Sequence, residues 1–254
     1  MPLPSTTSTE RASSAPRPVE LRLLPSRSGS LGLEALGERA LVHVAACALL
    51  LATAHLLTAF VRRTRSLVPE ELLSLFDMSQ ERSLNSWLSV SLLLLLGGSI
   101  CVLARALRER LLYLVGSFFL FLSLDDQTML HERVGALCWS PLRGSGTYPW
   151  LIAVAPLFAL GGLLAFAPLW RLTADRRDLR RRLVLGFACL ALALPLEWIE
   201  SCIAAHDLRW HGVGLGQLTI PIEETLELLG PALLLACVAG LLECALQRGS
   251  RFSV

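Results

Sequence analysis

The sequence predicts an all-α, polytopic membrane protein, a helical bundle with six transmembrane helices. Of its 254 residues, 54% are hydrophobic and 17% are charged, whereas a soluble domain carries about 25% charged residues. The mean hydropathy is +0.57. Six apolar runs, each near the ~20 residues that cross ~30 Å of hydrocarbon, are separated by short polar segments. Because backbone groups in lipid must pair internally, we expect each run to be a helix.

The apolar runs divide the chain into three regions. The expected helices cover residues 40–60, 86–104, 111–132, 150–170, 183–205 and 219–242. Residues 1–38 are rich in Ser, Thr, Pro and Arg, which predicts a disordered tail. The six-helix transmembrane domain then covers residues 39–246, and residues 247–254 form a second tail.

The distribution of arginine predicts the orientation of the bundle. The chain has no lysine, so all 23 basic residues are arginine. If the N-terminus is inside, 16 arginines lie on the inner side and 7 on the outer side. Since positive residues accumulate on the cytoplasmic side of membrane proteins, both tails are expected in the cytoplasm. This arrangement favours a multi-pass protein of the bacterial inner membrane. The small net charge of +2 argues against a nucleic-acid partner.

The longest outer connection, residues 61–85, contains the string VPEELLSLFDMSQERS, which is typical of a short helix at the membrane interface. Asp77 and Glu81 fall above the bilayer in this scheme. We expect both to be solvated, with a lid folded over the bundle as the alternative.

Ionisable side chains lie at one depth in four of the predicted helices. At ~1.5 Å of rise per residue, they lie roughly 21–29 Å above the inner ends of their helices. They are His55 in the first helix, Asp125 and Asp126 in the third, Glu197 and Glu200 in the fifth, and Glu223, Glu224 and Glu227 in the sixth. His131 and Glu132 follow the two aspartates. Periodicity places the acids of each helix on one face, so we expect them to share a pocket that opens to the outer side.

So many carboxyl groups at one depth require compensation. A charged side chain costs about 2.5–3.5 kcal/mol at the bilayer centre, and less near its edge. A bound cation, shared protons or arginine partners would each offset this cost. Only Arg133, Arg209 and the loop residue Arg82 are candidate partners of the acids by sequence. This deficit of positive charge indicates a bound metal or bound protons.

The leading hypothesis is a divalent metal ion of unknown identity. Carboxylates with histidine are suitable ligands for such an ion, and a metal-bound water would act on a lipid-like, membrane-soluble substrate. The spacing matches no known metal signature, and the reaction and catalytic residues stay undefined. The candidate ligands are His55, Asp125, Asp126, His131, Glu132, Glu197, Glu200, Glu223, Glu224 and Glu227.

Two other functions remain open. A proton- or cation-coupled carrier would also use intramembrane acids, but no comparable acid lies in the inner half of any predicted span. The third hypothesis is a non-catalytic membrane scaffold, in which the acidic network fixes helix register or binds a partner. The sequence does not define the oligomeric state.

The strings SLDDQTMLHE and EETLE resemble those of a family of uncharacterised bacterial multi-pass membrane proteins. The pattern of that family reads S-L-D-[DE]-x4-H-E in one span and E-E-x-x-E in the last. The resemblance covers about residues 40–245 and implies a multi-pass topology. The matching positions are Asp125, Asp126, His131, Glu132, Glu223, Glu224 and Glu227, with Asp126 where the family more often has Glu.

Overall fold

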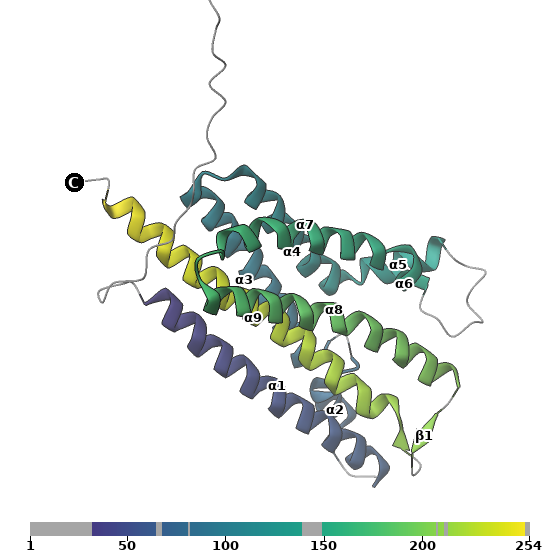
Figure 1. Ribbon diagram of the computed structural model, residues 1–254. Helices are drawn as coiled ribbons and strands as arrows, with labels where there is room; N and C mark the ends of the chain where they lie inside the picture. Colours follow the sequence, from purple (N-terminus) through teal and green to yellow (C-terminus); the bar gives the residue numbers. More distant parts are fainter. Residues whose placement is uncertain are drawn as a thin grey trace, which may run out of the picture.

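The computed structural model describes residues 32–64, 68–80, 82–138, 149–206, 208–210 and 213–251. These residues are helical apart from loops and one short hairpin, in which β1 (Arg209–Trp210) pairs antiparallel with β2 (Val213–Gly214). The helices are α1 (Leu33–Arg63), α2 (Glu70–Phe76), α3 (Leu84–Leu107), α4 (Arg110–Thr128), α5 (Leu130–Cys138), α6 (Pro149–Ala153), α7 (Ala155–Leu172), α8 (Arg177–Ala205) and α9 (Gly216–Arg251), shown in Figure 1.

The prediction of an all-α fold is confirmed, and its long apolar helices suggest a multi-pass membrane protein. Five helices, α1, α3, α7, α8 and α9, are long and apolar enough to cross a membrane. All six predicted apolar runs are helical. Helix α4 is not among these five, and its last turn carries Asp125, Asp126 and Gln127.

Helix α9 is the central helix of the bundle. It packs against α1, α3 and α8, and in Figure 1 it runs between α1 and α8. Glycines allow close approach at the α8–α9 crossing, since a Cβ built on Gly230 would lie 3.1 Å from the carbonyl oxygen of Gly186. Small residues at such crossings let helix backbones pack closely, as is common between membrane helices.

One half of the bundle is filled by an apolar cluster. It lies where α3 ends, α4 begins and α7 turns into α8, and it includes Leu103, Leu112, Phe119 and Leu183, all fully buried. Beyond it, an ion-pair network joins the adjacent ends of three helices. Arg176 donates to Glu34 of α1 at 2.9 Å and to Asp178 of α8 at 2.8 Å, while the Glu34 amide donates to Glu243 of α9 at 2.7 Å.

The boundary of the N-terminal tail is partly wrong. Helix α1 begins at Leu33, inside the region predicted to be disordered, whereas residues 1–31 lie outside the described part of the chain. The first two turns of α1 are held by Arg176 on Glu34 and by Arg182 on Glu38. At the other end, α9 continues to Arg251, so the predicted tail begins as helix.

Two predicted spans are interrupted. The run 111–132 breaks at Met129, which adopts a left-handed conformation with φ of 52° between α4 and α5. The run 150–170 breaks at Val154, directly before the proline-containing first turn of α7. The first break lies within the predicted site and determines its geometry.

Candidate functional site

A cavity of about 240 Å³ lies at the end of the bundle away from the apolar cluster. Helices α3, α4, α5, α8 and α9 contribute to its wall, together with the segment that joins α2 to α3. It is lined by Met78, Ser79, Gln80, Ser86, Ser89, Asp126, His131, Glu132, Glu197, Glu200, Ile220, Glu223, Glu224 and Glu227.

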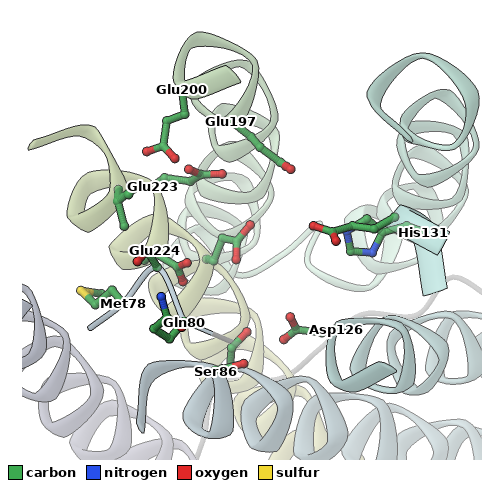
Figure 2. Close-up of a pocket in the computed structure, with 14 residues that line it drawn as sticks. Met78, Gln80, Ser86, Asp126, His131, Glu197, Glu200, Glu223 and Glu224 are labelled. Atoms are coloured by element: carbon green, nitrogen blue, oxygen red, sulfur yellow. The ribbon is translucent and has the colours of Figure 1, made fainter. Parts of the chain in front are cut away.

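The lining is strongly acidic. Seven of these residues are aspartate or glutamate, and none of the described lining residues is an arginine. In Figure 2, His131 and Asp126 lie on one side of the space, and Glu200, Glu223 and Glu224 lie on the other. The side chains therefore surround the cavity rather than meet at one point.

This arrangement bears on the predicted metal site. Within the described residues, no group of three or more His, Cys, Asp or Glu side chains is placed to hold a metal ion between them. A chelate with several direct protein ligands is therefore not supported. Eight of the ten candidate ligands line the cavity, and the remaining two, Asp125 and His55, have other partners.

Asp125 is a partner of His131 rather than a lining residue. Its side chain is buried, and the His131 amide donates to Oδ1 at 2.9 Å while the ring Nδ1 lies 2.6 Å from Oδ2. Because an ionised carboxylate only accepts hydrogen bonds, we assign the ring proton to Nδ1. Within the described residues, no polar contact of Nε2 is seen; this nitrogen is an acceptor when the ring is neutral and a donor when the ring is protonated. Histidines that bind metals usually have such a carboxylate on the other nitrogen.

The helix break at Met129 brings these two residues together. In a continuous helix His131 would project away from Asp125, because residues six apart lie on different faces. Instead, the Met129 amide donates to the Asp125 carbonyl oxygen and ends α4, and the Asp125 carboxylate caps the first turn of α5 through the His131 amide. A non-glycine residue in the left-handed region costs roughly 1–2 kcal/mol, which these bonds offset.

Trp150 of α6 connects the two sides of the site. Its Nε1 donates to Glu197 Oε1 at 2.8 Å, and its ring packs edge-on against His131 with centroids 4.5 Å apart. Its place in the site was not predicted from the sequence. A tryptophan beside a proline after a turn-rich loop is typical of an interfacial anchor, and no pattern in the sequence indicates that its indole reaches Glu197.

Two cavity acids have neutral hydrogen-bond donors as partners. Asn85 Nδ2 donates to Glu224 Oε2, and the Asn85 side chain is buried. Trp150 Nε1 donates to Glu197 in the same way. These neutral donors offset part of the cost of burying negative charge.

His55 lies beside the cavity wall and binds the segment between α2 and α3. The ring is fully buried, and its Nδ1 accepts a hydrogen bond from the Met78 amide at 3.1 Å. The same nitrogen lies 3.2 Å from Asp77 Oδ1. The interpretation of His55 as a cavity ligand is thus not supported by its placement.

Asp77 is 2% exposed, so the prediction that it is solvated is wrong. Arg62, in the last turn of α1, donates to its Oδ2, and both the amide and hydroxyl of Ser79 donate to its Oδ1. Burial raises the pKa of Asp77, but the bonds from Ser79 and Arg62 outweigh burial and hold the pKa below its usual value. Glu81 lies outside the described residues.

Met78, Ser79 and Gln80 line the cavity although the sequence carries no signal for it. They belong to a polar connection of the kind that usually lies on the surface. The contacts of Asp77 with Arg62 and of the Met78 amide with His55, both on α1, explain their position.

Comparison with known proteins identifies a family but no activity. No curated protein and no solved structure matches the chain. The sequence model of one family matches residues 42–241, most of the bundle and all of the cavity-lining residues. The chain therefore belongs to the family described as Domain of unknown function (DUF8692).

Proposed function

We propose that this protein is a six-span membrane protein with both termini in the cytoplasm, and that its acidic cavity binds a cation from the outer side. One observation carries the proposal: seven carboxyl groups line a single cavity of about 240 Å³, and no described lining residue is an arginine. A cation is the ligand that such a concentration of acids near a membrane favours most strongly.

A hydrated divalent ion suits this cavity better than a bare one. Carboxylate oxygens are the ligands that Mg²⁺ and Ca²⁺ prefer, and Mg²⁺ usually keeps several waters when it binds one or two carboxylates. The cavity volume is about eight times the ~30 Å³ share of one water molecule, which leaves room for an ion with its shell. Asp126, Glu197 and Glu223 would hold it mainly through water, with His131 Nε2 as a nitrogen acceptor.

The resemblance of the two acidic strings to bacterial multi-pass proteins supports the bacterial inner membrane as the location. A lipid-like, membrane-soluble molecule is the substrate class that a cavity at this depth would receive. A bound divalent ion would supply an activated water for its hydrolysis.

A proton- or cation-coupled carrier is the second candidate, because the clustered carboxyl groups of the cavity would also suit an ion pathway. A carrier also needs a polar route to the inner face. Within the described residues, that half of the bundle is filled by the apolar cluster around Leu103, Leu112 and Phe119. We therefore place static cation binding first.

Calorimetry on detergent-purified protein tests the proposal. The metal-stripped protein is titrated with Mg²⁺, Ca²⁺, Mn²⁺ and Zn²⁺, alongside a Glu223→Gln/Glu227→Gln variant. Glu71→Gln is the matched control, since Glu71 is an exposed residue of α2 that does not line the cavity.

We expect the wild type and the control to bind a divalent ion with equal affinity, and the cavity variant to lose about tenfold or more. Failure of the wild type to bind any of the four ions contradicts the proposal. Cation flux into proteoliposomes would favour the carrier instead.

A further inference from the structure

We infer that residues 77–80 form a strap that gates the acidic cavity, and that Arg62 and His55 of α1 hold this strap closed. The inference rests on the proposed function, because the gate controls access of the cation to its site.

The strap is part of the cavity wall. Met78, Ser79 and Gln80 all line the cavity, and Figure 2 shows Met78 and Gln80 on the same side of it as Glu224. Connections between helices usually lie exposed on the surface. In this strap, by contrast, Asp77 and Met78 are buried, so specific contacts must hold them inward.

Asp77 is the centre of those contacts. The Arg62 guanidinium donates to Asp77 with one nitrogen and to Glu70 of α2 at 2.5 Å with the other, so one side chain holds both α2 and the strap. The hydroxyl and amide of Ser79 fold back onto the same carboxylate at 2.6 and 3.1 Å. The strap is therefore preformed around a single carboxyl group.

His55 adds a second point of attachment from the same helix. Its Nδ1 accepts the Met78 amide hydrogen bond at 3.1 Å in a fully buried environment. The Arg62 side chain, by comparison, is 32% exposed. We call these contacts of Arg62 and His55 with the strap the latch. The latch combines a partly exposed ion pair with a fully buried hydrogen bond, and both come from α1.

These attachments leave the acid cluster untouched. Asp77 binds α1, whereas the next three residues of the strap line the cavity. None of the latch contacts described above uses a cavity carboxyl group. Release of Asp77 would therefore open one wall while Asp126, Glu197 and Glu223 keep their positions.

Two measurements on the full-length protein in lipid nanodiscs test the gate. The first is hydrogen–deuterium exchange of the strap amides in the wild type, Asp77→Asn and Arg62→Gln. The second is the rate at which a small cationic methanethiosulfonate reagent labels Ser86→Cys, a cavity-lining position, read by mass spectrometry of that peptide. Glu71→Gln is the control. It removes a charge from α2, the short helix that also carries Glu70, and leaves the contacts of Arg62 and His55 with the strap in place.

We expect both latch variants to raise strap exchange and Ser86→Cys labelling by about tenfold, the effect of losing a contact worth about 1.4 kcal/mol. Exchange in α9 and all rates in the control should not change. If Asp77→Asn fails to fold, Arg62→Gln alone still tests whether the latch holds the strap, because it changes a partly exposed side chain of α1.

If the strap amides exchange at the wild-type rate in both variants, the inference that the latch holds the strap closed is overturned. If the strap amides exchange faster while the labelling rate of Ser86→Cys does not change, the inference that the strap gates the cavity is overturned. Neither readout needs a bound metal, so a gate that opens as expected in a protein that binds no divalent ion would reject the proposed function alone.

Discussion

At the scale of single residues, the site depends on pairing between groups that the sequence shows only as separate acids and bases. Asp125 was predicted as a ligand, but both of its oxygens contact His131. It therefore acts as a positioning residue, which sets the ring orientation and leaves Nε2 as the acceptor. Asp77 plays a similar part for the strap through Arg62 and Ser79.

Replacing Asp125 by asparagine tests this positioning role. The asparagine amide can donate to Nδ1, which would move the ring proton of His131 to Nε2 and remove its acceptor. We expect divalent-ion affinity to fall about 10–100-fold, the usual cost of losing the carboxylate behind a liganding histidine. Calorimetry gives the affinity, and ¹⁵N NMR of the histidine ring gives the tautomer. An unchanged tautomer with full affinity would contradict the assignment.

The carboxyl group of Asp77 predicts that the stability of the protein depends on pH. The pKa of Asp77 is lower in the folded protein than the ordinary value of 3.8. Its contribution to stability is therefore complete above that value and is lost as the pH falls through the lower, folded pKa. The gap in thermal midpoint between wild type and Asp77→Asn should be constant from about pH 8 to pH 5 and should shrink below about pH 4. A gap that shrinks near neutral pH would point to a different group.

At the scale of helices, close crossings make the bundle rigid around the cavity. A Cβ built on Gly97 of α3 would lie 2.9 Å from the Gly116 carbonyl oxygen of α4, whereas one on the adjacent Gly98 meets nothing within 4 Å. The same helices carry Ser89 and Asp126 into the cavity wall. Their separation therefore sets the shape of that side of the site.

Alanine substitutions at the two neighbouring glycines form a matched pair. Gly97→Ala forces α3 and α4 apart, so it should destabilise the protein by about 1–3 kcal/mol. Gly98→Ala should be neutral or stabilise by up to about 1 kcal/mol, because alanine is the better helix former. Thermal unfolding in detergent measures both. Equal effects would show that the crossing is not close.

At the scale of the whole molecule, the two ends of the bundle differ in charge. Arginines concentrate where α3 passes to α4 and where α7 passes to α8, for example Arg105, Arg110, Arg176 and Arg180, and the cavity at the other end is acidic. This polarity follows the arginine distribution, from which we expect the acidic end to face outward.

Cysteine accessibility in intact cells tests the orientation. Ser79→Cys, on the strap, and Ala174→Cys, between α7 and α8, are both exposed positions at opposite ends. A membrane-impermeant thiol reagent should label Ser79→Cys in intact cells and Ala174→Cys only after permeabilisation. The reverse pattern would place the cavity in the cytoplasm.

Much of the fold follows from the sequence, and less of the site does. The apolar runs predict every long helix because membrane insertion depends on local composition. The prediction of one continuous helix over residues 111–132 was wrong, since the break at Met129 depends on Asp125 binding an amide six residues away. Composition carries no signal for such a bond. Asp77 was wrong for the same reason, because its partner Arg62 lies 15 residues earlier with no periodic relation to it.

The sequence by itself determined that this chain is helical, with several segments long and apolar enough to cross a membrane, and it predicted that the acids lie at one depth, because hydropathy and helical rise are properties of each segment alone. Only the tertiary structure decided which acids line the cavity, which of them pair with His131 and with α1, and that a partly buried strap forms one wall. Those features depend on how helices rotate, break and approach one another. That arrangement is decided by contacts between residues far apart in the chain.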